Sequence, residues 1–148
     1  MTPQSRSGRI LAIDPGEKRI GVAAADLRMR VALPLTTIEA GADPVEAVAR
    51  LAEDEGAEAI VVGLALSLSG AVGPQAQRAQ SLADALADRL DIPVHTWDER
   101  LTTTEAQRRL PRDRRHPRSK RRRGDVDALA AAIILQAFLD SQRSLAGG

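Results

Sequence analysis

The run of residues 59–63 (AIVVG) most constrains the fold, because nearly every position in it is apolar. A strand that buries one face alternates apolar with polar residues, whereas a strand that buries both faces is apolar throughout. Strands of the second kind occur in parallel sheets that are covered by helices on both sides. The run therefore predicts a central, parallel strand in an α/β protein.

Three strand-like runs precede this segment. Residues 9–14 (RILAID) and 20–26 (IGVAAAD) lie on either side of a turn that opens with the signal DPG, which predicts two strands joined by a tight connection. The third run covers residues 31–38 and contains Pro34. Because proline cannot donate a hydrogen bond to a neighbouring strand, this third strand is expected at an edge of the sheet.

Helices and strands alternate in the rest of the chain. Apolar residues recur at steps of three and four along residues 74–90, a spacing typical of an amphipathic helix. The order βββαβαβα, followed by a C-terminal helix, predicts an α/β mixed five-stranded sheet with an antiparallel side, a parallel side and helices on both faces. The expected helices cover residues 44–56, 74–90, 102–110 and a last stretch from Asp125 or Asp127 to Leu139, with a strand at 92–97. Asp43 and Pro44 are typical of the start of the first of these helices, and Gly56 is typical of its end.

The length of 148 residues is typical of one domain, so we expect a single domain over residues 1–148. No apolar run approaches the roughly 18 residues that a membrane span needs, and the first residues lack the pattern of a signal peptide. We therefore expect a cytoplasmic protein that makes no membrane contact. The chain has no cysteine and two histidines, so any metal should be held by oxygen atoms.

Positive charge is concentrated in residues 108–123, which contain ten Lys or Arg residues and one Asp. The other residues carry 11 basic against 19 acidic groups. Mutual repulsion and two prolines predict a mobile arm that contacts a polyanion, although a solvated loop or a targeting patch is the alternative. The arm residues expected to bind nucleic acid are Arg114, Arg115, Arg118, Lys120, Arg121, Arg122 and Arg123.

Acidic residues stand at the ends of several expected elements. Asp14 ends the first strand, Asp98 and Glu99 end the last, and Asp125 and Asp127 open the final helix. Ligands of such sheets bind beyond the carboxyl ends of the parallel strands, and clustered carboxylates there favour Mg²⁺ or Mn²⁺. Taken singly, each acid could instead begin a turn, pair with an arginine or cap a helix.

Four segments resemble, in order and in spacing, the motifs of the YqgF/RuvX family, and together they extend over about residues 9–139. That family resembles Holliday junction resolvases of the RuvC kind and has the ribonuclease H-like fold. It is linked to maturation of the small-subunit (16S) ribosomal RNA precursor and to cleavage of branched DNA. The segments are DPGEKRIGVA from residue 14, VVGL from residue 61, DERLTT from residue 98 and VDALAAAIIL from residue 126.

The resemblance implies a role for each matched acid. Asp14 would be the metal ligand of the first strand, Glu99 the second carboxylate and Asp127 the ligand from the last helix. Neighbours on a strand point to opposite faces, so only one of Asp98 and Glu99 should reach the metal, and we expect it to be Glu99. Asp125 lies within one helical turn of Asp127 and is a candidate supporting group.

Two arginines in the matched turns, Arg19 and Arg100, suit phosphate binding, with a surface salt bridge as the alternative for Arg100. The loop after VVGL departs from the family, which commonly reads PLNMDG where this chain reads ALSLSG. Ser67 and Ser69 therefore stand in place of Asn and an acid. This difference leaves three strong acids for the site and predicts low or substrate-dependent activity.

These observations lead to the hypothesis of a metal-dependent endonuclease that hydrolyses phosphodiesters in structured RNA, branched DNA or both. A homodimer would suit paired cuts across a two-fold junction. The alternative is a ribosome-assembly or nucleic-acid-binding factor with weak or no catalysis. An ATPase of the actin and sugar-kinase superfamily is a more remote alternative, because such proteins enclose the nucleotide between two domains.

Overall fold

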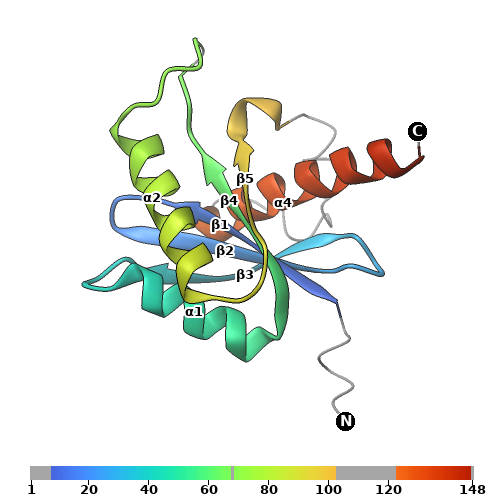
Figure 1. Cartoon of the computed structure of the whole chain (residues 1–148), viewed down its shortest axis with the longest axis horizontal. Helices are drawn as coiled ribbons and strands as arrows, with labels where there is room; N and C mark the ends of the chain where they lie inside the picture. The colour runs from blue at the N-terminus through green and yellow to red at the C-terminus, as the bar shows by residue number, and fades with distance from the viewer. Residues whose placement is uncertain (1–7, 68, 103–122, 148) are drawn as a thin grey trace.

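The computed structural model describes residues 8–67, 69–102 and 123–147 of the chain. Its strands form one five-stranded sheet in the order β3-β2-β1-β4-β5 (Figure 1). β2 pairs antiparallel with β1 and β3, and β4 pairs parallel with β1 and β5, so the mixed sheet predicted from the sequence is confirmed. The strands are β1 (Arg9–Pro15), β2 (Arg19–Asp26), β3 (Ala32–Glu39), β4 (Ala57–Leu64) and β5 (Val94–Asp98). The helices are α1 (Pro44–Glu55), α2 (Pro74–Arg89) and α4 (Arg123–Gly147).

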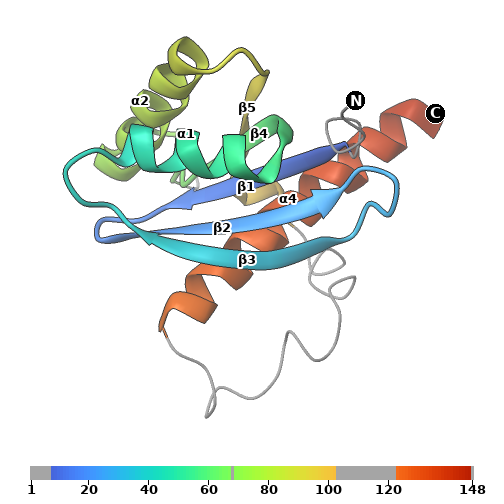
Figure 2. The ribbon, with the colours of Figure 1, turned by 90° about the horizontal axis from the view of Figure 1, so that it is seen from below.

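Alternation along the strands divides the core into two layers. On β1, Leu11 and Ile13 belong to the apolar cluster formed with α1 and α2, whereas Ile10 and Ala12 belong to the cluster formed with α4. Figure 2 shows the same division, with α1 and α2 over one face of the sheet and α4 across the other. Residues two apart on a strand therefore face the same helix layer.

The two most specific strand predictions are confirmed. β4 lies inside the sheet between two parallel neighbours, and the side chains of Ile60, Val61 and Val62 are fully buried. The middle position of the sheet belongs to β1. β3 is an edge strand, and its register against β2 shifts where Pro34 pairs with Ala23.

Helix α1 begins and ends where its sequence predicts. The Asp43 carboxylate accepts a hydrogen bond from the Glu46 backbone N–H at 3.0 Å, and Pro44 occupies the first turn. At the other end Gly56 adopts a left-handed conformation, with φ of 67°, that few other residues tolerate. Asp43 as the N-cap and Gly56 as the C-cap therefore set the bounds of α1 that the sequence predicts.

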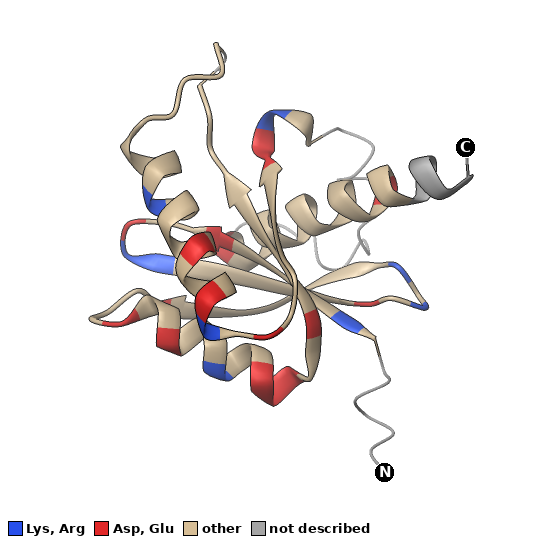
Figure 3. Ribbon diagram, in the orientation of Figure 1, with Lys and Arg blue, Asp and Glu red and all other residues tan. Residues whose placement is uncertain are grey.

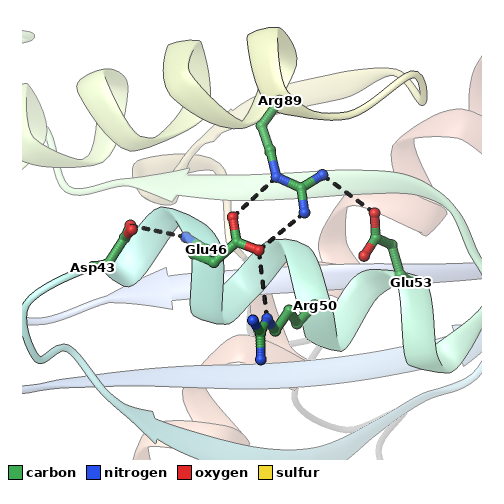
Figure 4. Close-up of polar contacts among 5 residues, drawn as sticks. All are labelled: Asp43, Glu46, Arg50, Glu53 and Arg89. Carbon is green, nitrogen blue, oxygen red and sulfur yellow. Dashed lines mark hydrogen bonds and ion pairs between the residues drawn. The ribbon is translucent and has the colours of Figure 1, made fainter.

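An arginine on α2 ties the two helices of this layer together (Figure 4). Arg89 donates through Nε and Nη2 to the two carboxylate oxygens of Glu46, both at 3.0 Å, and through Nη1 to Glu53 at 3.2 Å. Arg50 bonds the same Glu46 along α1. These contacts are exposed, so they orient α2 on α1 while the apolar layer beneath holds both helices to the sheet.

The structure differs from the sequence-based prediction near the end of β5 and in α4. β5 ends at Asp98 and is followed by a 3₁₀ turn, η2 (Glu99–Leu101), with Thr102 in extended conformation. The helix predicted over residues 102–110 falls on residues outside the described ranges, apart from Thr102, as does most of the basic arm. α4 starts at Arg123 and is longer than predicted at both ends.

None of the helices in the described part of the chain is long and apolar enough to cross a membrane.

Candidate active site

Asp14 lies at the end of β1, on the face of the sheet that α4 covers. Ile13 before it packs with the α1 and α2 layer, so alternation directs Asp14 to the opposite face. Its partner across the antiparallel pair is Gly21 of β2. The side chain is partly buried at the place where β1 and β2 meet the start of α4.

Glu99 reaches this place from β5. It opens the turn η2, and a Cβ atom on Gly63 of β4 would lie 2.8 Å from Glu99 Oε2. Glycine at position 63 therefore leaves the space that the Glu99 carboxylate occupies. The sequence predicts Glu99 on a strand, but in the structure it lies in the turn η2, so the turn and not strand alternation separates its side chain from that of Asp98.

Asp127 comes from the first turns of α4. A Cβ atom on Gly21 would lie 2.0 Å from the Asp127 carbonyl oxygen, so the helix backbone packs directly on this glycine. Arg19 lies two residues earlier on the same face of β2, and its Nε atom donates to Asp127 Oδ2 at 2.8 Å. The expectation that Arg19 binds phosphate stays a prediction.

The three carboxyl groups of Asp14, Glu99 and Asp127, here called the acidic cluster, influence one another electrostatically. Burial, then Glu99, then Asp127 raise the pKa of Asp14 to about 7. Burial also raises the pKa of Glu99, while the hydrogen bond with Asp14 opposes that rise. Asp14 therefore holds the proton that the pair shares and donates it to Glu99. Carboxyl pKa values raised in this way are typical of functional sites.

Asp98 does not join the acidic cluster but binds Arg100. Its carboxylate accepts from Arg100 Nε at 3.0 Å, from Nη2 at 2.6 Å and from the Arg100 backbone N–H at 2.9 Å, and these bonds lower the pKa of Asp98. The guanidinium also approaches the loop after β4, where a Cβ atom on Gly70 would lie 3.6 Å from Arg100 Nη1. The structure thus shows the salt bridge that was the alternative for Arg100, and a phosphate contact stays a prediction.

The donor set of the acidic cluster fits a hard divalent cation. All its donors are carboxylate oxygens, which Mg²⁺ and Mn²⁺ prefer. Burial first, and then the negative charge of Glu99 and Asp127, raise the pKa of Asp14, and a bound cation would offset both effects. Within residues 8–67, 69–102 and 123–147, however, no three such side chains are already arranged to hold a metal ion. In the structure, Asp127 Oδ2 accepts a hydrogen bond from Arg19 Nε at 2.8 Å.

Several predicted site residues cannot be placed. Arg114, Arg115, Arg118, Lys120, Arg121 and Arg122 lie outside the described residues. The backbone of Arg123 and Asp125 belongs to the first turn of α4. In the loop after β4, Ser67 and Ser69 bond each other at 3.0 Å, and Ser67 Oγ accepts from Ala71 N–H at 3.1 Å.

Acidic residues and a cavity are also found outside the acidic cluster. Acidic residues gather on α1 and at the end of β5, beside a basic residue in the following turn (Figure 3). A cavity of about 680 Å³ lies between α1, α2 and the turn after β1, lined by Pro15, Val45, Gln77 and Leu82 among others. The cavity lies on the α1 and α2 side of the sheet, and its lining residues Pro15 and Gly16 directly follow Asp14 in the chain.

Two glycines shape the site, and neither is among the residues predicted from the sequence to form it. Gly21 allows the α4 backbone to approach β2, and Gly63 makes room for the Glu99 carboxylate. Their positions within the matched segments were a usable signal, because a glycine inside a strand often marks a close approach of another group. The sequence alone does not say which group approaches.

Comparisons with known proteins show the family to which the chain is related. A family model described as RuvX, Holliday junction resolvase, matches residues 8–141. A relative from Roseiflexus sp. (strain RS-1), named "Putative pre-16S rRNA nuclease", is 45% identical over 141 residues, covering 94% of this chain and 99% of the relative. A relative of the same name from Caldanaerobacter subterraneus subsp. tengcongensis is 40% identical over 138 residues, covering 92% of this chain and 99% of the relative.

Solved structures support the fold. RuvC of Thermus thermophilus in complex with a Holliday junction substrate matches with a TM-score of 0.58 at 15% identity, covering 91% of this chain and 95% of that one. A second Thermus thermophilus RuvC structure matches with a TM-score of 0.56 at 15% identity, covering 92% and 96% of the two chains. At this identity the likeness concerns the fold, which is ribonuclease H-like.

Proposed function

The chain belongs to the RuvX family, and from this membership we propose that it is a nuclease that hydrolyses phosphodiester bonds in structured nucleic acid, with the acidic cluster as its active site. One observation above all supports this proposal. Asp14 of β1, Glu99 of η2 and Asp127 of α4 lie near one another at one edge of the sheet. The substrate is branched DNA, a precursor of 16S ribosomal RNA, or both. Such substrates place the protein in the cytoplasm.

We assign Mg²⁺ or Mn²⁺ as the cofactor, held by Asp14, Glu99 and Asp127. A cation bound there would neutralise phosphate charge and activate the attacking water. The side chains have their own tasks. Asp14 must release the proton that it shares with Glu99, which its pKa of about 7 allows near neutral pH. Partial burial of Asp14 and Glu99 would limit the access of competing water to a cation held by these carboxylates.

Substrate contacts come from basic side chains. Arg100, whose orientation is set by Asp98, lies between β5 and the loop after β4 and suits a backbone phosphate. The basic arm, with Arg114, Arg115, Arg118, Lys120, Arg121, Arg122 and Arg123, would hold the nucleic acid backbone by charge. With one Trp, one Phe and no Tyr, the chain should recognise shape and backbone rather than stacked bases. Paired cuts at a four-way junction would require a homodimer.

One observation favours the alternative of an assembly factor with weak catalysis. In the loop after β4, Ser67 and Ser69 bond each other and the loop backbone. This arrangement supplies no fourth acid to the site.

The deciding experiment is a cleavage assay of the wild type and Asp14→Asn in Mn²⁺, Mg²⁺ and chelator, on a four-way DNA junction and a structured precursor RNA. Asp14→Asn should abolish cleavage and leave nucleic acid binding intact or tighter, because it removes a ligand and a negative charge that faces phosphate. Asp88→Asn is the matched control, since Asp88 is exposed on α2, and it should cut like the wild type.

The outcomes separate the two functions. Metal-dependent cutting by the wild type and by Asp88→Asn, but not by Asp14→Asn, supports the nuclease, and the preferred substrate chooses between DNA and RNA. Binding without cutting by all three proteins supports the assembly factor. Loss of binding in Asp14→Asn alone would contradict the assignment of Asp14.

A further inference from the structure

Asp127, one of the three acids of the acidic cluster, forms an ion pair with Arg19. Arg19 Nε lies 2.8 Å from Asp127 Oδ2, and the two side chains are 28% and 32% exposed. This contact joins residues 108 positions apart in the sequence, at the start of β2 and in the first turns of α4. Its location is unusual for a stabilising surface pair, because Asp127 is one of the acids we assign to the active site.

The backbone around this pair has little freedom to move. The Gly16 N–H donates to the Arg19 carbonyl oxygen at 2.9 Å, and a Cβ atom on Gly16 would lie 2.7 Å from that oxygen. On the other side, the Asp127 carbonyl packs directly on Gly21. Because both backbones are held by close packing, any rearrangement here must come from the side chains.

The Arg19 guanidinium also supplies positive charge where carboxylates gather. Asp98 has Arg100 as its own counter-ion, whereas Asp14 and Glu99 share a proton. A divalent cation bound between Asp14, Glu99 and Asp127 would lie beside the guanidinium. Like charges repel at short distance in a partly buried site, so a cation bound at Asp127 Oδ2 would displace the guanidinium that now donates to this oxygen.

We propose that Arg19 is an internal counter-ion of the acidic cluster, which competes with a divalent cation for the Asp127 carboxylate and is released when the cation binds. The inference rests on the proposed function, since it uses the same three acids. Release of Arg19 places a guanidinium with no carboxylate partner next to the site, where it can bind a substrate phosphate. Cation loading and phosphate binding would then be coupled through one side chain.

The first test is calorimetric titration of the protein with Mn²⁺ alone, without nucleic acid. Arg19→Gln should bind Mn²⁺ about three- to tenfold more tightly than the wild type, because it removes the competing partner and its charge. Arg9→Gln is the matched control, since Arg9 forms an ion pair with Glu55 away from the cluster. Its Mn²⁺ affinity should equal that of the wild type.

A double-mutant cycle separates competition for Asp127 from simple charge repulsion. Asp127→Asn should weaken Mn²⁺ binding, and Arg19→Gln added to it should change the affinity by less than about twofold. If Arg19→Gln raised the Mn²⁺ affinity equally with and without Asp127→Asn, Arg19 would act only through the repulsion between its charge and the cation. This result would overturn the proposed competition for Asp127. Weaker binding by Arg19→Gln alone would mean that Arg19 positions Asp127 for the cation, which also overturns it.

A measurement on the wild type covers the case in which Arg19→Gln fails to fold. The Nε–H signal of Arg19 in ¹⁵N NMR should move toward that of a solvated arginine as Mg²⁺ is added, while the signal of Arg9 stays in place. An Arg19 signal unchanged at saturating Mg²⁺ overturns the proposal. If no cation binds to any variant, the metal requirement and this inference both fall, whereas cation binding without cleavage contradicts only the proposed nuclease.

Discussion

Asp14 owes its chemistry to its surroundings more than to its residue type. The carboxyl group lies where β1 meets β2 and α4, shares a proton with Glu99 and feels the charge of Asp127. Its pKa is raised to about 7 from an ordinary value of 3.8. Two observable quantities therefore depend on pH through this group, the free energy of unfolding and the affinity for a cation.

Between about pH 4 and pH 7 the folded protein holds a proton on Asp14 that the unfolded chain has released. Raising the pH through this window therefore lowers stability, and the loss is complete above about pH 7. Asp14→Asn removes this penalty, so in chelator the variant should be more stable than the wild type at about pH 8, by roughly 1–2 kcal/mol after allowance for solvent screening.

The advantage should shrink as the pH falls and vanish below about pH 4, where Asp14 is protonated in both the folded and the unfolded state. Urea unfolding of the two proteins across this range measures it, with Asp88→Asn as the exposed control. A difference between Asp14→Asn and the wild type that does not change with pH would contradict the raised pKa of Asp14. Cation affinity should follow the opposite course and rise with pH up to about 7, because a ligand must lose its proton before it binds metal.

At the scale of elements, α4 decides whether the site forms. This helix covers one face of the sheet and carries Asp127, and its backbone packs directly on Gly21 of β2. The position of Asp127 relative to Asp14 depends on that approach, because Gly21 and Asp14 are partners in the β1–β2 pair. A small displacement of α4 would therefore open the acidic cluster as well as the core.

Gly21→Ala should destabilise the protein by about 2 kcal/mol or more, since the new methyl group would meet helix backbone that cannot turn away. Urea unfolding measures the loss. Gly73→Ala is the control, because a Cβ atom there meets nothing within 4 Å and should cost little. If Gly21→Ala were as stable as Gly73→Ala, α4 would not be held against β2 at this point.

At the scale of the whole molecule, charge is divided between an acidic domain and a basic segment. Residues 108–123 carry ten basic groups and one acidic group, whereas the remaining residues carry 11 basic and 19 acidic groups. The acidic part should repel nucleic acid away from the site, so we expect the segment to supply most of the phosphate contacts. Affinity for nucleic acid should then depend strongly on salt.

Replacing Arg121, Arg122 and Arg123 together by Gln should weaken binding and flatten its salt dependence, by up to about 0.9 units of log–log slope for each lost duplex phosphate contact. Binding of a four-way junction over a range of salt concentrations measures the slope. The control is a second triple variant, in which Gln replaces the exposed residues Arg28, Arg50 and Arg78. It loses the same amount of positive charge, and its salt dependence should stay near that of the wild type. Equal slopes in both triple variants would show that the segment does not contact nucleic acid.

The sequence by itself determined the elements and the identity of the candidate acids. The apolar run at residues 59–63 predicted an interior parallel strand, Pro34 predicted an edge strand, and Asp43 with Gly56 predicted the bounds of α1. These predictions succeed because periodicity, turns and caps are properties of neighbouring residues. The resemblance to a known family added which acids to compare.

Only the tertiary structure decided how those acids meet. It brought Arg19 within 2.8 Å of Asp127, paired Asp98 with Arg100, and set Glu99 in the space above Gly63. It also raised the pKa of Asp14, since burial and the charges of distant residues exist only once the sheet and α4 have packed. Contacts between residues as far as 108 positions apart leave no local pattern, and the packing of α4 on β2 creates them.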